Sequence, residues 1–180
     1  ADYGVISGTT SGWVNVPVPN FAAEISALAR DVSGKLWIGT DGDGAWRRNG
    51  VNDFTHFPAG NLSGLPGGRV RDMTVDVNGR LWLATDGGLA TRSANYWLIF
   101  KTINSGLPGN DLLALGVDDG GSLWVGTSDQ GIGIFAANGG GGWTTQKMSN
   151  GLPSNRVQAL HTDGAGGMWA GTDAGLAHFN

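Results

Sequence analysis

Four charged residues stand seven positions before an aspartate in a recurring turn, and their signs alternate along the chain. These residues are Glu24, Arg69, Asp111 and Arg156. If the fold brings these carboxylates and guanidinium groups to one pocket, they could hydrogen-bond the hydroxyls of a sugar or of another small polar ligand. Neighbouring members would also attract one another, although partly exposed ion pairs add little stability. We therefore expect a ligand site here, with mutual ion pairing as the competing interpretation.

Further polar groups lie in glycine-rich segments at 41–44, 86–88, 128–131 and 173–175. Their carboxylates are candidate ligand-binding groups: Asp41, Asp43, Asp86, Asp129 and Asp173. Segment 41–44 does not begin an EF-hand, because Asn52 stands where that loop needs a glutamate. We expect neither a bound metal nor a cofactor.

Trp46 is the only tryptophan without a counterpart in the other repeats, and it lies beside Arg47 and Arg48. An aromatic ring that the repeat does not require could stack on a sugar face or on a partner chain. Ordinary packing between repeats is the alternative.

The chain offers little for catalysis. His56, His161 and His178 occupy different parts of the repeat, and no nucleophile motif accompanies them. Glu24 is the only glutamate, and the recurrent aspartates have a structural explanation as turn residues. We predict that the protein is not an enzyme.

These residues belong to a unit that occurs four times. Each unit has an aspartate, a tryptophan six positions later and a threonine three positions after that. The aspartates are Asp31, Asp76, Asp118 and Asp163; the tryptophans are Trp37, Trp82, Trp124 and Trp169; the threonines are Thr40, Thr85, Thr127 and Thr172. The threonines are 45, 42 and 45 residues apart, a period typical of solenoids, propellers and arrays.

Within a unit, short apolar or alternating runs bounded by glycine turns predict strands rather than helices. An innermost strand ("RVRDMTVD") leads through an aspartate turn to "LWLAT", then to "GLATR" and to an aromatic outer strand ("YWLIF"). Four antiparallel strands in each unit make the blade of an all-β propeller, with the β-helix as the main rival. We expect the four repeated tryptophans in the core.

In such a blade, the loops before the first strand and after the second strand fall on the same face. The charged residues, the loop aspartates and Trp46 should then gather around the mouth of a central tunnel, the default ligand site of a ring.

The two ends of the sequence hold parts of blades within a single domain spanning 1–180. We place two strands at 2–20, whole blades at 24–67, 69–110 and 111–155, and three strands at 156–180. The first segment could complete the last blade and so hide exposed sheet edges. A four-bladed ring, an eight-bladed ring of two chains and a fragment of a larger propeller all remain open; we favour self-association into a homo-oligomer.

Composition excludes several other classes. The chain has no cysteine, so neither disulfides nor thiolate metal sites hold it together. A net charge of -4 argues against nucleic acid as a partner. No apolar run is long enough to predict insertion into a membrane. The first residue is Ala1, so we expect a processed or excised piece.

The segment "GLPSNRVQALHTDGAGGMWAGTDAGL" resembles the repeat of the two-component regulator propeller family, with its GLP loop, aspartate turn and LW-x-GT strand. Segments "GTDGDGAW" and "GTSDQGIG" depart from its simple glycine pair. The resemblance implies a periplasmic or extracellular sensor domain of a bacterial regulator, in a family some of whose members detect oligosaccharides.

Ligand or partner recognition is therefore the expected function, with an oligosaccharide or another small polar molecule as the candidate ligand. One alternative is a structural, self-assembling propeller fragment or engineered repeat protein without a ligand. Another is a propeller lyase similar to the virginiamycin-type lyases, which also have "LW" strands.

Overall fold

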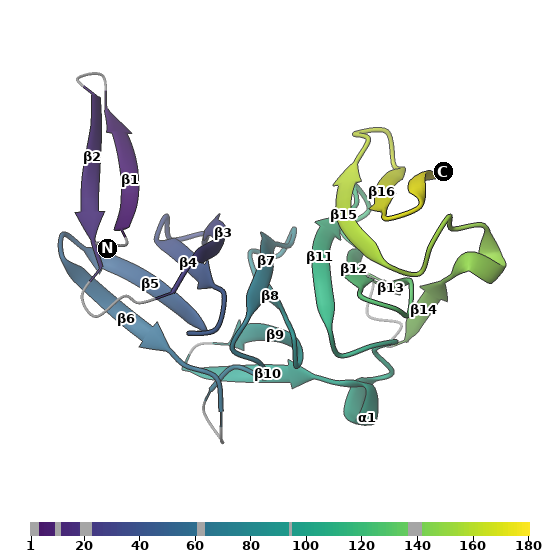
Figure 1. Cartoon of the computed structure of the whole chain (residues 1–180), viewed down its shortest axis with the longest axis horizontal. Coiled ribbons are helices and arrows are strands. Elements are labelled where there is room, and N and C mark those ends of the chain that lie inside the picture. Colours follow the sequence, from purple (N-terminus) through teal and green to yellow (C-terminus); the bar gives the residue numbers. More distant parts are fainter. Residues whose placement is uncertain (1–3, 10–11, 19–22, 61–63, 94, 137–141) are drawn as a thin grey trace.

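The computed structural model describes residues 4–9, 12–18, 23–60, 64–93, 95–136 and 142–180. Within these ranges the strands form five antiparallel sheets arranged along an arc (Figure 1). The first and the last strands of the chain lie at opposite ends of the arc. Figure 1 also shows that the first strand of each larger sheet lines the concave side. The all-β propeller architecture predicted from the sequence is confirmed.

The sheets follow one another in the sequence, and we name them from the N-terminal end. The hairpin consists of β1 (Gly4–Thr9) and β2 (Gly12–Pro17). Blade I contains β3 (Ile25–Arg30), β4 (Leu36–Thr40), β5 (Ala45–Gly50) and β6 (Asp53–Phe57). Blade II contains β7 (Val70–Val75), β8 (Leu81–Thr85), β9 (Gly88–Ser93) and β10 (Tyr96–Phe100).

The remaining elements complete the arc. Blade III contains β11 (Leu112–Val117), β12 (Leu123–Thr127), β13 (Ile132–Phe135) and β14 (Trp143–Gln146). Blade IV contains β15 (Val157–Thr162), β16 (Met168–Thr172) and β17 (Gly175–Phe179). Two short helical turns, α1 (Thr102–Ser105) and η1 (Met148–Asn150), precede blades III and IV.

The core lies between consecutive sheets. Trp37 of blade I is 2% exposed and packs in one cluster with Met73, Leu81 and Leu83 of blade II. Trp82 and Trp124 repeat this contact with the following blade. Because burying a large aromatic side chain removes much apolar surface from water, these interfaces hold the arc together.

Trp169 differs from the prediction that all four tryptophans are core residues. Its side chain is 39% exposed. Trp37, Trp82 and Trp124 each pack against the sheet that follows their own, and no sheet follows blade IV among the described strands.

The small residue before each threonine lets the next blade come close. A Cβ atom on Gly39 would lie 2.8 Å from Cγ1 of Val70, and one on Gly126 would lie 2.8 Å from the carbonyl oxygen of Val157. Val70 and Val157 are fully buried at the start of the next innermost strand. Glycine is therefore required by contact at these two positions.

The aspartate turn fastens the tryptophan of its own blade. One carboxylate oxygen of Asp31 accepts the backbone N–H groups of Ser33 and Lys35, and the other accepts Nε1–H of Trp37 at 2.8 Å. Asp76 and Asp118 accept their tryptophans at 2.9 and 2.8 Å. Burial acts to raise the pKa of Asp31, but the hydrogen bonds from Ser33, Trp37 and Lys35 outweigh it and lower the pKa.

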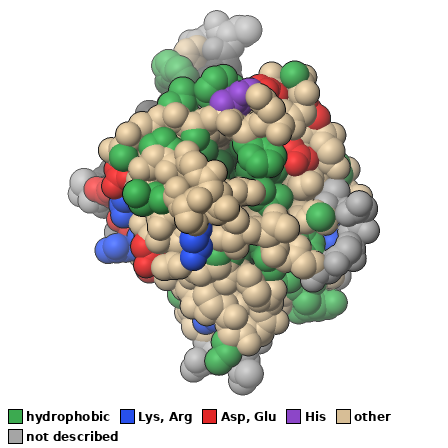
Figure 2. Space-filling view, turned by 90° about the vertical axis from the view of Figure 1, so that its right-hand side faces the viewer, with side chains coloured by type: hydrophobic (Ala, Val, Ile, Leu, Met, Phe, Trp, Pro, Cys, Tyr) green, Lys and Arg blue, Asp and Glu red, His purple; other side chains and the backbone are tan. Residues whose placement is uncertain are grey.

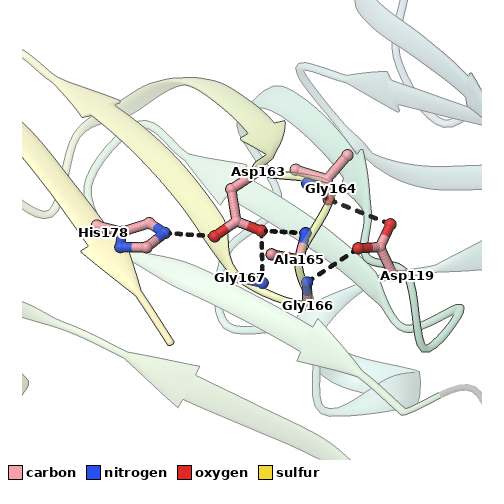
Figure 3. Close-up of polar contacts among 8 residues, drawn as sticks. Asp119, Asp163, Gly164, Ala165, Gly166, Gly167 and His178 are labelled. Carbon is pink, nitrogen blue, oxygen red and sulfur yellow. Dashed lines mark hydrogen bonds and ion pairs between the residues drawn. The ribbon is translucent and has the colours of Figure 1, made fainter.

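Blade IV uses a different partner in the same turn (Figure 3). Asp163 Oδ2 lies 2.7 Å from Nε2 of His178, while Oδ1 accepts the N–H groups of Ala165 and Gly167. The imidazole stacks on Trp169 with ring centroids 4.1 Å apart. Hydrogen bonds led by that from Ala165, followed by that from His178, lower the pKa of Asp163.

The hairpin does not complete blade IV. It forms a sheet of its own, and Val16 and Val18 pack against Ile38 and Trp46 of blade I. It therefore occupies the place of a preceding blade, at the opposite end of the arc from β17 (Figure 1). In this structure the hairpin therefore does not close a ring by adding a strand to the last sheet of the same chain.

Replacing Asp31 with Asn should lower the free energy of unfolding by about 1 to 2 kcal/mol at pH 7, because the amide keeps only one acceptor oxygen. The folded-state pKa of Asp31 is lowered, so its contribution is present above the unfolded value near 3.9. It is lost as the pH falls through the folded pKa. Urea unfolding should therefore show the gap between D31N and wild type closing toward acid.

The matched control for this prediction is Asp129→Asn, since Asp129 is exposed and makes no hydrogen bond or ion pair within the described residues. D129N should be as stable as wild type at every pH. If D31N were as stable as D129N, the Asp31 carboxylate would contribute nothing to the free energy of unfolding.

Candidate functional site

The largest group of predicted site residues lies in a hollow on the concave side, between blades I and II. Its volume is about 320 Å³, and we call it the inner hollow. It is lined by Glu24, Ile25, Ser26, Asp41, Arg69, Val70 and Arg71. The starts of β3 and β7 and the loop after β4 supply these side chains. Ser26 Oγ donates to the carbonyl of Val70 and ties the two innermost strands together.

Backbone contacts confirm that the two sets of loops share a face. The N–H groups of Gly42 and Gly44 donate to the carbonyl of Gly68 at 3.2 and 2.8 Å. Gly131 donates to Asn155 in the same way between blades III and IV. The loop after the second strand is thus fixed to the loop that enters the next blade.

An exposed ion pair crosses the rim of the inner hollow. Arg69 Nε lies 3.0 Å from Asp41 Oδ1, and the two side chains are 56% and 49% exposed. Such a pair contributes little to stability in water. Its remaining N–H groups and lone pairs face solvent, so they are free to exchange water for ligand hydroxyls.

A second ion pair lies deeper and is incompletely satisfied. Arg71 Nη2 is 3.3 Å from Asp111 Oδ1, too poorly aligned to count as a hydrogen bond. Arg71 Nε and Asp111 Oδ1 are both buried and lack a hydrogen-bond partner within the described residues. Because buried polar atoms are nearly always paired, these two require water or a ligand group.

The alternating residues take different positions from those expected of mutual ion pairs. Glu24 and Arg69 share the inner hollow, Asp111 lies one innermost strand further on, and Arg156 is exposed beside blade IV. Within the described residues, none of these four side chains forms an ion pair with another of the four. The ion-pair partner of Arg69 is Asp41, and that of Asp111 is Arg71.

Arg71 was not among the residues predicted for the site. It occupies the second position of the innermost strand, where the other blades have Ser26, Leu113 and Gln158. A charged residue on a strand that borders a tunnel was the signal that could have identified it.

Trp46 is a packing residue rather than an exposed platform. It is 7% exposed, lies against Val16 and Ile38, and stacks on His56 with ring centroids 4.1 Å apart. Asp43 holds both rings: its Oδ2 accepts Trp46 Nε1–H at 3.2 Å, and His56 Nε2 contacts its carbonyl oxygen at 2.8 Å. The prediction that Trp46 and Asp43 contact a ligand is therefore not supported by their positions.

The other loop aspartates lie apart from the inner hollow. Asp86 Oδ1 accepts the N–H group of Arg69 at 3.2 Å, which orients the start of β7. Asp129 and Asp173 are exposed. Among the residues that the structure describes, no three His, Asp or Glu side chains are placed to hold a metal ion. Among the described residues, neither α1 nor η1 is long and apolar enough to cross a bilayer.

Trp46→Ala should lower the free energy of unfolding by about 3 to 5 kcal/mol, as expected for truncating a buried aromatic ring. Trp13→Ala, which truncates a ring that is 79% exposed, should change it by less than about 0.5 kcal/mol. Urea denaturation followed by circular dichroism would measure both. A W46A protein as stable as W13A would contradict the packing role.

Comparison with known proteins places the fold. The chain superimposes on the extracellular domain of the hybrid two-component system BT3049 from B. thetaiotaomicron, with a TM-score of 0.83 and 23% identity over 98% of this chain and 25% of that one. The extracellular domain of the one-component system BT4673 from the same organism gives a TM-score of 0.77 and 19% identity, over 100% of this chain and 26% of that one. This chain thus spans about a quarter of the length of either domain.

A catalytically inactive virginiamycin B lyase from Staphylococcus aureus, solved with quinupristin, gives a TM-score of 0.73 and 14% identity, over 99% of this chain and 63% of that one. No curated protein sequence matches. The family described as two component regulator propeller matches residues 64–87 and 151–174. The chain therefore has the β-propeller fold and contains two stretches that are similar to two-component regulator propeller repeats.

Proposed function

We propose that the protein is a non-catalytic recognition module that binds a small polar ligand, such as an oligosaccharide, in the inner hollow. The observation that carries the proposal is the hollow itself, with Glu24, Asp41, Arg69 and Arg71 in its wall. Guanidinium groups donate hydrogen bonds and carboxylates accept them. Together they match the hydroxyls of a sugar, which both donate and accept.

The incompletely satisfied ion pair of Arg71 and Asp111 would make the site selective for particular ligands. A ligand hydroxyl near Arg71 and Asp111 could accept from Arg71 Nε and donate to Asp111 Oδ1. A site built to hydrogen-bond a hydroxyl discriminates strongly against analogues that lack it, because its buried groups are then left unpaired. Trp46 is buried elsewhere, so recognition would depend on charged groups more than on that ring.

The absence of a catalytic role is part of the same proposal. Glycoside hydrolysis needs a carboxylic acid whose pKa is raised. Among the described residues, Asp72 is the carboxyl whose pKa is raised, by burial. Both its oxygens accept backbone N–H groups, from Met73 at 2.8 Å and Leu115 at 2.7 Å, and it does not line the inner hollow. Its role is to link β7 to β11.

We infer a location outside the cytoplasm, periplasmic or extracellular. The support is the repeat family together with the likeness to two domains that are described as extracellular. Within a longer protein, such a module would report ligand binding to signalling parts.

Binding of the wild-type chain to an array of neutral and acidic oligosaccharides, followed by calorimetry with the best ligand, tests this function. Arg69→Ala should weaken binding at least about tenfold, the loss expected when a charged hydrogen bond is removed. Arg156→Ala is the matched control, because that exposed arginine lies outside the inner hollow. Equal affinities of R69A and R156A, or no binding by any oligosaccharide, would overturn the proposal.

Self-assembly is the second candidate, and the exposed ends of the arc favour it. Leu28 of blade I is 53% exposed, and Leu176 and Trp169 of blade IV are 66% and 39% exposed. Figure 2 shows hydrophobic side chains at several places on the C-terminal end. Equivalent positions are buried between inner blades, so these faces fit further blades or a second copy of this chain.

Light scattering coupled to size exclusion separates the two candidates. A particle of twice 18.6 kDa or more would support self-assembly. If R69A/R156A loses sugar binding but keeps its mass, recognition is supported. If instead the double variant falls to the monomer mass, the loop face serves assembly.

A further inference from the structure

Two arginines face each other across the gap between blades I and II, away from the inner hollow. Arg47 lies on β5 opposite Trp37, and Arg92 lies near the end of β9 opposite Trp97. Arg92 Cζ is 4.5 Å from the ring centroid of Phe57 and 5.3 Å from that of Trp97. Arg47 Cζ is 5.8 Å from the Phe57 centroid and 5.6 Å from that of Trp37. We call Arg47 and Arg92 the arginine pair.

In the part of the chain that the structure describes, no carboxylate forms an ion pair with the arginine pair. None of the ion pairs within the described residues includes either guanidinium group. Arg47 Nε donates to Asn49 Oδ1 at 2.9 Å, and the nearby Asp53 accepts from Asn49 rather than from an arginine. Asp31 is already occupied by its own turn and by Trp37. Two positive charges therefore share one half-buried location without an ion-pair partner from the described ranges.

The other blades show that packing does not require this arrangement. Opposite Trp82 and Trp124, the positions equivalent to Arg47 hold Thr91 and Ile134. Opposite Trp143, the position equivalent to Arg92 holds Phe135. Each of these gaps is closed by neutral residues. The arginine pair is thus an addition to the repeat, at one gap, with an electrostatic cost.

Electrostatics indicate what would offset that cost. Burial, and secondly the charge of Arg47, lower the pKa of Arg92. Stacking on an aromatic ring occupies the face of a guanidinium group and leaves its N–H edge available. Such edges match oxyanions bidentately, which makes arginine the preferred residue for carboxylate, sulfate and phosphate groups. Trp97 Nε1–H is a further buried donor without a hydrogen-bond partner within the described residues.

We propose that the arginine pair binds an oxyanion group of a ligand, a carboxylate, sulfate or phosphate, between blades I and II. The aromatic residues Trp37, Phe57 and Trp97 hold the two guanidinium groups in place. The bound anion neutralises their repulsion and joins the two blades. This site is distinct from the inner hollow, since Arg92 lies toward the opposite end of its strand from the loop face.

Thermal unfolding in sodium sulfate, phosphate, acetate and chloride at equal ionic strength tests the proposal. For wild type, at least one oxyanion should raise the melting midpoint in a saturable way that chloride does not reproduce. Arg47→Gln and Arg92→Gln should each raise the half-saturating concentration at least about tenfold, as expected for loss of one charged donor. The oxyanion with the lowest half-saturating concentration identifies the ligand group.

Arg48→Gln is the matched control, because Arg48 is adjacent in sequence but donates to the carbonyl of Gly50 and belongs to the other face of β5. It should respond like wild type, as should R69A, which alters the inner hollow alone. General salting-out by sulfate would act equally on all variants. Identical anion responses of R47Q, R92Q and R48Q would overturn the proposal.

A second readout covers the case in which R92Q folds poorly. In NMR spectra of the wild type, the Nε–Hε resonance of Arg92 should shift saturably with the same oxyanion. Arg92→Lys, which keeps the charge but loses the two parallel N–H donors of the guanidinium group, should weaken the response. An Arg92 resonance that does not move while the protein is stabilised would place the anion elsewhere and contradict the proposal.

Discussion

The structure depends on burying one tryptophan between each blade and the next. The ring lies at the gap, and its only polar atom is a donor that must be paired inside the protein. The turn aspartate meets this need in blades I, II and III, and also orders the turn that reverses the chain. One carboxylate thereby fixes a hairpin and orients the ring on which the following blade packs.

The fold could be predicted from the sequence because these constraints recur at a fixed spacing. The turn aspartate, strand tryptophan and small residue before threonine each predict a local conformation, and four copies leave few alternatives. The exposure of Trp169 could not be read in this way, because it depends on what lies beyond blade IV. The position of the hairpin was likewise undecided, since its strand pattern fits either the start or the end of the arc.

The candidate site was only partly predictable. Counting back from the turn aspartate identified Glu24 and Arg69, which the structure brings together with Asp41 in the inner hollow. It missed Arg71, whose strand position is apolar or neutral in the other blades, and it did not identify Asp41 and Arg71 as the ion-pair partners of Arg69 and Asp111. Side-chain partners across a gap depend on which loop approaches, and the register of the repeat does not specify that. The sequence left two roles open for Trp46, ligand stacking and packing, because the hairpin that packs against it belongs to a different sheet.

The contact between a small residue and the first buried valine of the next blade also bears on how such proteins evolve. Gly39 with Val70 and Gly126 with Val157 make the same junction two blades apart. Since each blade touches only its neighbours, duplicating or deleting one whole unit of the gene would recreate the same junction. The number of blades can then change in steps of one repeat, while loops and gaps such as that of the arginine pair diverge independently.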